Sequence, residues 1–303
     1  MQALQVSVQV DLARVRENAE QIRRATGVPL RAVIKADAYG LGAREISNVL
    51  ADLVEDFCYF TVEEARDVRR PGLCLGPAAN APEEYAALRV RPSIATVDEA
   101  ARFAGIPHAV NFDTGMNRFG CELDTLRRLL NAGNVVDVWT HAANVDACIA
   151  LRNATASARV RCHGACSSLL DQPAAWLDGV RPGVALYRGA LRVTVPLIVA
   201  RRNGRPAGYT QFHAESFGVI PVGYSHGLRA ASAHVNGRAQ RIVEVGMNTA
   251  FVTLHHNDRI GDQVVLLGGP LTEKQIATET QSREHEVMCR YGAMGVRTYL
   301  RNE

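Results

Sequence analysis

The sequence has no long apolar segment and no long run of one charge. No apolar stretch approaches the ~20 residues that a helical membrane span needs, and the amino terminus lacks the basic start and apolar core of a signal peptide. The net charge is only +3, and no basic run is longer than Arg-Arg. The sequence therefore indicates neither nucleic acid nor an acidic membrane surface as a partner. We therefore expect a cytoplasmic protein whose partner is a small molecule.

Cysteines are few and do not form a pattern. Their number is seven, which is odd, and they are scattered through the chain, so the sequence predicts reduced thiols rather than a disulfide framework. Cys162 and Cys166 are close, but no second Cys or His pair stands at the spacing of a zinc site. We expect no metal.

A strand and helix rhythm runs through the first part of the chain. Thr61–Glu64 and Thr96–Glu99 are capping-box sequences, each directly after an apolar run, as a strand-to-helix turn requires. Eight β–α units in roughly 180 residues have the length of a compact (β/α)8 barrel. The eight apolar runs lie at about 31–34, 57–60, 73–75, 92–95, 108–112, 135–140, 159–162 and 177–181.

After Tyr187 the pattern changes to strand-like runs joined by Gly, Asn and Pro turns, with one predicted helix over 271–281. The sequence predicts an α/β fold: a barrel over 9–188 and a mostly-β domain over 189–303, joined by an amino-terminal strand over 1–8. The strand-like runs are 194–199, 217–222, 241–245, 251–254, 263–267 and 286–289.

Lys35 follows the apolar run Ala32–Ile34 and precedes a tyrosine and two glycines. Parallel α/β enzymes place reactive groups at the carboxyl ends of their strands. A partly desolvated lysine there can act as a nucleophile towards an aldehyde and can carry pyridoxal phosphate as a Schiff base. The alternative is a surface lysine after an edge strand.

Six short sequence blocks occur in the order of a known family, and the resemblance covers nearly the whole chain. Through them the chain resembles the alanine racemases, which are pyridoxal-phosphate enzymes with an amino-terminal barrel, a carboxy-terminal β domain and shared active sites in a homodimer. The blocks are Ala32-Val-Ile-Lys-Ala-Asp-Ala-Tyr-Gly40, Asp113-Thr-Gly-Met-Asn-Arg118, Thr140-His-Ala142, Val180-Arg-Pro-Gly-Val-Ala-Leu-Tyr187, Ile220-Pro-Val-Gly-Tyr224 and Val265-Leu-Leu-Gly268.

The resemblance implies two catalytic bases, because racemisation removes the α proton from one face and returns it from the other. Lys35 serves one face, and Tyr209, reaching the barrel of the other subunit, serves the second. A phenol has an ordinary pKa near ~10, so it needs cationic neighbours, and Arg118 and His141 occupy the matching positions. The alternative for Tyr209 is a core tyrosine of the β domain.

Further roles follow from the same resemblance. Arg181 faces the pyridine nitrogen and keeps it unprotonated, which disfavours transamination and decarboxylation. Substrate contacts fall to Arg118, Tyr224 and the backbone of Met247. The other cofactor contacts fall to Tyr39, His141, Ser167, Gly183, Val184 and His285, in addition to Lys35 itself.

Four positions depart from the family pattern. Asn111 stands where many relatives carry a carbamylated lysine, so we hypothesise that a chloride ion sits between Asn111 and Arg118. Cys166 replaces an asparagine, Asn248 an aspartate and His285 a phosphate-binding tyrosine. Compact connections near the inferred site add to these changes and leave the substrate open.

The predicted activity is the interconversion of L- and D-alanine or a related small amino acid. One alternative is a racemase for a different amino acid in a specialised biosynthetic pathway. A basic amino-acid decarboxylase has an acidic residue in the place of Arg181, and a barrel that binds the cofactor only for homeostasis lacks the β domain. A degenerate racemase that binds the cofactor without turnover is the last alternative.

Overall fold

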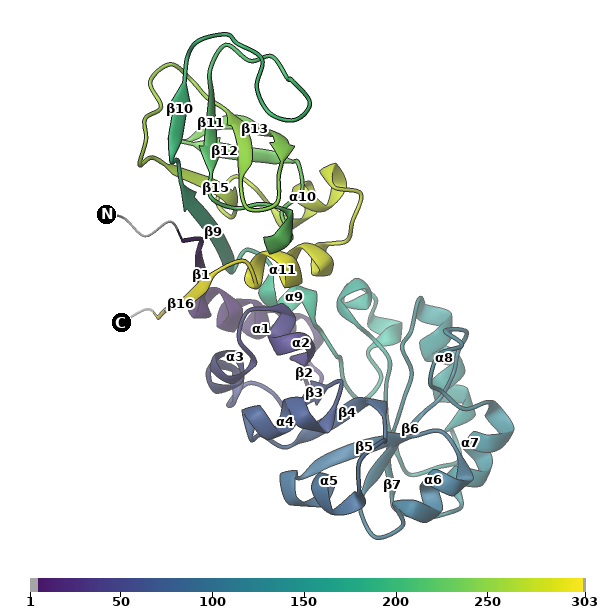
Figure 1. Ribbon diagram of the computed structural model, residues 1–303. Helices are drawn as coiled ribbons and strands as arrows, with labels where there is room; N and C mark the ends of the chain where they lie inside the picture. Colours follow the sequence, from purple (N-terminus) through teal and green to yellow (C-terminus); the bar gives the residue numbers. More distant parts are fainter. Residues whose placement is uncertain (1–4, 302–303) are drawn as a thin grey trace. The chain divides into compact units, whose positions relative to one another are not determined.

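A computed structural model describes residues 5–301 (Figure 1). The chain divides into two compact units, and each is described by itself. The barrel unit consists of Val15–Ala38 and Gly42–Leu186, and the β unit consists of the residues up to Arg14, Tyr39–Leu41 and the residues from Tyr187 on. The domain boundaries predicted from sequence stay a prediction. No helix among residues 5–301 has the length and apolar character that a membrane span requires.

The barrel unit is built on a curled sheet of seven parallel strands that pair in sequence order. Nearly every residue of these strands is buried, as in parallel sheets that are covered on both faces. The strands are β2 (Arg31–Val33), β3 (Asp56–Tyr59), β4 (Gly72–Pro77), β5 (Val90–Ile94), β6 (His108–Asn111), β7 (Val135–Trp139) and β8 (Arg161–His163).

The eighth predicted strand is present as a hydrogen-bonded segment without regular strand geometry. Residues 178–182 bond to β8 and its continuation on one side, through Asp178 N to Cys162 O (2.9 Å) and Arg181 N to Ala165 O (2.8 Å). On the other side, the carbonyl of Val180 accepts from Arg31 N (2.9 Å) on β2. The segment therefore joins the two edges of the seven-stranded sheet.

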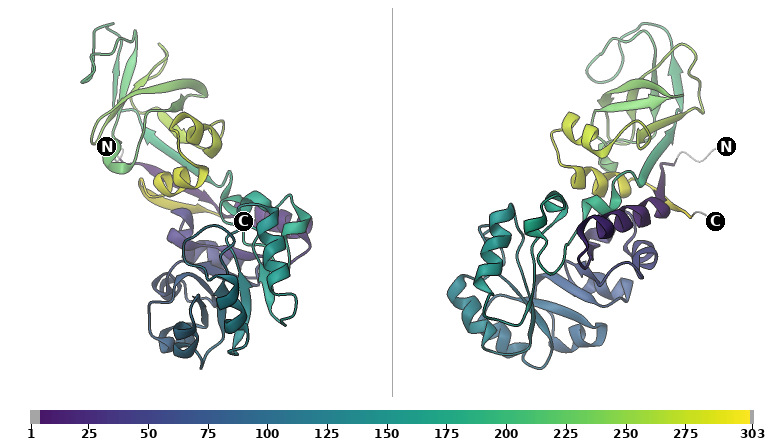
Figure 2. Two further views of the ribbon diagram at one scale, coloured as in Figure 1. Left: turned by 90° about the vertical axis from the view of Figure 1, so that its right-hand side faces the viewer. Right: turned by 180° about the vertical axis from the view of Figure 1, so that it is seen from behind.

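Helices follow the strands and lie around their outside, as Figures 1 and 2 show. The reciprocal capping box forms at Thr96 and Glu99. At Thr61 only half of it forms, because the Glu64 carboxylate accepts N–H groups other than that of Thr61. The helices of this layer are α1 (Leu12–Thr26), α3 (Ala43–Leu50), α4 (Val62–Val68), α5 (Pro82–Leu88), α6 (Val97–Arg102), α7 (Leu123–Leu130) and α8 (Val145–Ala154).

Charged side chains meet inside the barrel near the first residues of its strands. Arg31 is fully buried and pairs with Asp56 (3.0 Å) and Asp137 (3.3 Å). Arg91 and Arg161 also contact Asp137, at 2.7 and 3.0 Å, and Glu55 contacts Arg31 at 3.0 Å. Three guanidinium groups thus face three carboxylates, and this balance of charge is what allows such groups to be buried.

The β unit contains a nine-stranded sheet in the order β10-β11-β14-β13-β12-β15-β9-β1-β16. All pairs are antiparallel except β1 with β16. The strands are β1 (Ser7–Asp11), β9 (Leu191–Pro196), β10 (Val199–Arg201), β11 (Phe217–Ile220), β12 (Ser232–Val235), β13 (Arg238–Val245), β14 (Ala250–Thr253), β15 (Gln263–Leu267) and β16 (Val296–Leu300).

Two predictions for the β unit are wrong. The expected strand at 286–289 lies within helix α11 (Glu284–Gly292), so α10 (Glu273–Glu279) is not the only helix there (Figure 1). The short run Val-Met-Cys is apolar in either conformation, and a short apolar run does not distinguish strand from helix. Strands β12 and β16 were not predicted. The expected strand over 1–8 is β1, which begins at Ser7; residues 1–4 lie outside the described residues.

Candidate active site

Lys35 stands at the carboxyl end of β2, and an unusual turn follows it. Residues Ala36–Tyr39 all have φ between 52° and 59°, a left-handed conformation that costs roughly 1–2 kcal/mol for each non-glycine residue. The turn is fixed by hydrogen bonds from Ala38 N to Ile34 O (2.8 Å) and from Ala43 N to the Asp37 carboxylate (2.7 Å). Backbone strain of this kind persists where the surroundings over-determine it, which is typical of functional sites.

Lys35 is also the only lysine of the barrel. The sequence contains just one other, Lys274, which lies in helix α10 of the β unit. Arginine supplies the remaining basic side chains, and its guanidinium stays protonated and does not become a nucleophilic amine. Lys35 is therefore the one side chain of the barrel that can supply a nucleophilic amine.

Arg181 is buried against the ring of Trp139, with 4.5 Å from its Cζ to the ring centroid. One terminal N–H group donates to the carbonyl of Thr140. Its Nε is buried and has no hydrogen-bond partner among residues 5–301. Burial lowers the pKa of Arg181. A buried donor without an acceptor is costly, so this guanidinium fits a ligand that brings an acceptor, as a pyridine nitrogen does.

Ser167 and the turn at 183–185 meet at one point. The Ser167 hydroxyl accepts from the backbone N–H groups of Gly183 (3.0 Å) and Ala185 (3.1 Å), on either side of Val184. Two N–H groups of one turn and a hydroxyl thus converge, as backbone donors do in anion-binding concavities. The structure thus brings together three predicted phosphate contacts, Ser167, Gly183 and Val184, and adds Ala185, which the sequence did not indicate.

His141 lies in a strongly positive environment. Burial and, to a smaller extent, the charges of Arg181, Arg118 and Lys35 together lower its pKa to about 4. The expectation that His141 is cationic is therefore wrong, because the imidazole is neutral near pH 7. Three positive charges around one neutral ring favour anionic groups, such as a phosphate and a carboxylate.

Arg118 belongs to a loop that Asp113 organises. Burial would raise the pKa of Asp113, but the backbone N–H groups of the loop outweigh burial and hold the pKa below its usual value. Asp113 accepts from Gly115 N (2.6 Å) and Arg118 N (3.3 Å). The side chain of Arg118 is exposed and that of Asn111 is buried. The chloride hypothesis assumed that the Arg118 guanidinium is buried, but in the single chain it is exposed. The chloride ion stays a prediction.

Tyr39 belongs by its contacts to the β unit. Its ring lies 5.3 Å from that of Tyr187. The next residue, Gly40, packs so closely on α11 that an added Cβ would lie 3.0 Å from the carbonyl oxygen of Cys289. His285 is exposed in the first turn of the same helix. The predicted phosphate contacts Tyr39 and His285 are therefore placed in the β unit.

Tyr209 is not a core residue, because its side chain is 89% exposed. The Glu244 carboxylate fixes its backbone by accepting from Tyr209 N (2.7 Å) and Thr210 N (2.8 Å). The Tyr209 ring would lie 3.7 Å from a Cβ added at Gly246, whose carbonyl accepts from Tyr224 N at 2.9 Å. Tyr209 and Tyr224 thus both lie beside this glycine.

Met247 follows Gly246, and its side chain is exposed. The hydroxyl of Ser225, which the sequence did not single out, donates to Met247 O (2.7 Å) and lies 2.9 Å from Asn248 Oδ1. The predicted contacts Tyr209, Tyr224 and Met247 therefore surround one exposed turn.

Cys166, one of the four positions that depart from the family pattern, lies in the barrel unit. Its sulfur is 3.2 Å from the Ser168 hydroxyl.

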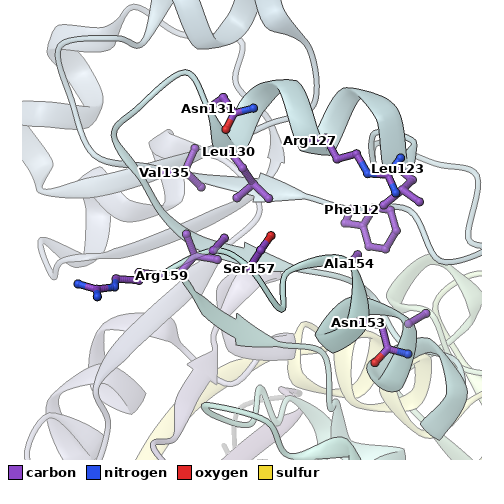
Figure 3. Close-up of a pocket in the computed structure, with 13 residues that line it drawn as sticks. Phe112, Leu123, Arg127, Leu130, Asn131, Val135, Asn153, Ala154, Ser157 and Arg159 are labelled. Carbon is purple, nitrogen blue, oxygen red and sulfur yellow. The ribbon is translucent and has the colours of Figure 1, made fainter.

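A pocket of about 710 Å³ opens on the outer side of the barrel, beside α7 and α8 (Figure 3). Arg127, Asn131, Asn153 and Arg159 give it a polar lining. None of the predicted site residues is among those that line it.

No group of three or more His, Cys, Asp or Glu side chains suited to a metal ion occurs among residues 5–301. The cysteines within this range form no disulfide.

Comparisons with known proteins agree over both units. The family model "Alanine racemase, N-terminal domain" matches residues 10–190, and "Alanine racemase, C-terminal domain" matches residues 197–299. The alanine racemase of Cereibacter sphaeroides is 27% identical over 96% of this chain and 97% of its own. The biosynthetic enzyme of Escherichia coli (strain K12) is 28% identical over 94% and 96%.

Solved structures give the same result. The biosynthetic alanine racemase of Pseudomonas aeruginosa has a TM-score of 0.89 at 25% identity, covering 98% of this chain and 99% of its own. An alanine racemase from Bartonella henselae with covalently bound pyridoxal phosphate has a TM-score of 0.87 at 22% identity, covering 98% and 99%. With both of its parts matched along most of its length, the chain belongs to the alanine racemase family.

Proposed function

We propose that this protein is a pyridoxal-phosphate-dependent racemase that interconverts L- and D-alanine or a closely related small amino acid. The observation that carries the proposal is the position of Lys35, the only lysine of the barrel, at the carboxyl end of β2. Family membership and the positive surroundings of His141 support it.

The residues present fit the cofactor. Lys35 would hold it covalently, the N–H groups of Gly183 and Ala185 with the Ser167 hydroxyl would hold its phosphate, and Arg181 would donate to its pyridine nitrogen. Val184, His141, Tyr39 and His285 are the further proposed contacts. When bound, the cofactor supplies the electron sink that makes loss of the α proton possible.

Two groups of the protein would move the proton. The Lys35 amine takes it on one face of the substrate, and Tyr209 of the partner subunit serves the other. Arg118 orients the substrate carboxylate, together with the backbone N–H of Met247 of the partner subunit, and Tyr224 lines the approach. Because His141 is neutral, Arg118 remains as the predicted cationic neighbour that stabilises an ionised phenol.

A homodimer with shared active sites is part of this proposal. Tyr209, Tyr224 and Met247 are all exposed around the turn at Gly246. Large side chains presented to solvent in one place are typical of an interaction surface. In a homodimer these side chains would reach the barrel of the second subunit.

Thiols that form no disulfide within residues 5–301 support a reducing compartment, and we propose the cytoplasm.

A racemase for another amino acid is the second candidate. Asn111, Cys166, Asn248 and His285 change charge and size at positions that the family places near its site. These changes bear on the substrate more than on the reaction.

The two lysines make the test direct. The holoprotein is reduced with borohydride and digested, and the modified peptide is identified by mass. The proposal requires the label on Lys35 and unchanged labelling in Lys274→Arg. Chiral chromatography after incubation with a panel of L-amino acids, alanine included, then measures turnover. Label on Lys274 alone, or no formation of any D-amino acid, would overturn the proposal.

A further inference from the structure

An aromatic pair joins the two cations of the proposed active site. The Lys35 Nζ lies 5.8 Å from the centroid of the Phe60 ring. Phe60 and Phe119 lie 6.2 Å apart between centroids and are tilted by 52°. The Arg118 Cζ is 5.4 Å from the Phe119 centroid. Each contact is within the range at which a cation and a ring, or two rings, attract each other.

The two rings come from distant parts of the barrel and remain accessible. Phe60 follows strand β3, Phe119 follows strand β6, and each is 37% exposed. Burial in the core does not account for their contact, since the barrel leaves both rings open to solvent in the single chain. Their shared position beside Lys35 and Arg118 assigns them to the site.

Glu64 links the backbone at Phe60 to the backbone directly after Lys35. One oxygen of its carboxylate accepts from Ala36 N (2.9 Å), directly after Lys35, and the other accepts from Phe60 N (2.7 Å). The Phe60 carbonyl is held as well, because it accepts from the Cys74 thiol (3.0 Å) and a Cβ at Gly76 would lie only 2.3 Å from its oxygen. The left-handed turn and the end of β3 are therefore coupled through one side chain.

We propose that the Phe60–Phe119 pair is the wall that selects the substrate side chain, and that Glu64 is its positioning residue. The proposal rests on the proposed function, in which the substrate amine reaches Lys35 and its carboxylate reaches Arg118. The ring pair connects these two cations by contact, so it borders the space that a bound substrate would occupy. The two apolar rings offer no polar partner to a charged side chain, and their bulk beside Lys35 favours a small side chain over a large one.

The specificity test compares Phe60→Ala with Leu123→Ala. Leu123 has a similar exposure, 38%, and begins helix α7 outside the ring pair. We expect Phe60→Ala to raise the ratio of kcat/KM for L-leucine over that for L-alanine by about 10-fold or more, the size of effect that a few methylene groups produce in a pocket. Leu123→Ala leaves the ratio within twofold. An unchanged ratio in folded, cofactor-loaded Phe60→Ala overturns the proposal.

A second readout does not depend on activity. Reductive ¹³C-methylation of the cofactor-free protein labels Lys35 and Lys274, besides the amino terminus, and Lys35→Arg identifies the Lys35 signal. The ring of Phe60 shifts that signal, so Phe60→Leu moves it towards the Lys274 signal. Glu64→Gln, which keeps one acceptor oxygen of two, moves it in part and lowers kcat for alanine with KM unchanged within twofold. A Lys35 signal that neither variant moves overturns the positioning.

The two levels of the proposal fail differently. If the unaltered protein racemises no amino acid of the panel, the proposed function and the wall fail together. If it racemises alanine and the leucine-to-alanine ratio does not respond to Phe60→Ala, the wall alone is rejected.

Discussion

The two units present their site residues in opposite ways. In the barrel, Arg181, Ser167 and the turn at 183–185 are held by hydrogen bonds inside the unit, and the charges around His141 come from the same unit. In the β unit, Tyr209 has a fixed backbone but a side chain that is 89% exposed. The contrast agrees with our proposal that the barrel binds the cofactor, while the β unit offers groups to the site of a second subunit.

The largest effect is expected for the amine of the barrel. Lys35→Ala removes the only lysine of that unit, so we expect loss of the visible absorbance of lysine-bound pyridoxal phosphate and racemisation at background level. Lys274→Arg is the matched control and keeps both. Absorption spectra and chiral chromatography measure the outcome, and a coloured, active Lys35→Ala protein would contradict the assignment.

Tyr209→Phe tests the exposed side of the contrast. We expect kcat to fall by about 10²–10⁴-fold, the usual contribution of a general acid or base. The midpoint of thermal unfolding should stay within 1–2 °C, roughly the scale of a surface substitution. Proton exchange from one enantiomer should persist better than its turnover. Tyr299→Phe removes a phenol hydroxyl elsewhere in the β unit and is the control. Equal losses of exchange and turnover in both directions would count against the two-base roles.

Asp137→Asn tests how much the buried charge cluster contributes to the stability of the barrel. Asp137 is fully buried and contacts Arg31, Arg91 and Arg161. Loss of its charge leaves one guanidinium uncompensated, and we expect the free energy of unfolding to fall by about 3–5 kcal/mol. Asp124→Asn breaks an exposed pair with Arg127, where Asp124 is 92% exposed, and should cost less than about 1 kcal/mol. Urea unfolding compares the two; equal costs would refute the role of the cluster.

The smallest effect concerns the neutral imidazole. The folded-state pKa of His141, about 4, is below the ordinary value of 6.5. Between these values the unfolded chain binds more protons, so stability rises with pH and is lost as pH falls from 6.5 towards 4. We expect His141→Gln to reduce the change in the free energy of unfolding over this pH range by on the order of 1 kcal/mol or less. Urea unfolding at a series of pH values measures it, and an unchanged slope would show that other groups carry it.

Much of the fold could be predicted because strand and helix signals are local. The apolar runs and the capping box at Thr96 identify the barrel strands and one helix start. The run at 286–289 was misassigned, because three apolar residues suit a strand and a helix equally. The left-handed turn at Ala36–Tyr39 was not predictable, since none of its residues is a glycine.

Only those site residues that stand in sequence motifs could be predicted. Lys35 and Arg181 stand in two of the sequence blocks that the chain shares with the family. The charge of His141 was not predictable, because it depends on burial and on three cations that are distant in sequence. The contact of Phe60 with Lys35 and Phe119 also depends on strands that meet only in the folded barrel.

The near absence of lysine has a practical consequence for anyone handling this protein. Amine-directed dyes, crosslinkers and surface-coupling reagents would find two side chains per molecule, one in each unit. With Lys274 replaced by arginine, Lys35 and the amino terminus would be the two amines left to such reagents. The mass of the peptide that carries Lys35 would then report the fraction of molecules whose Lys35 amine is accessible.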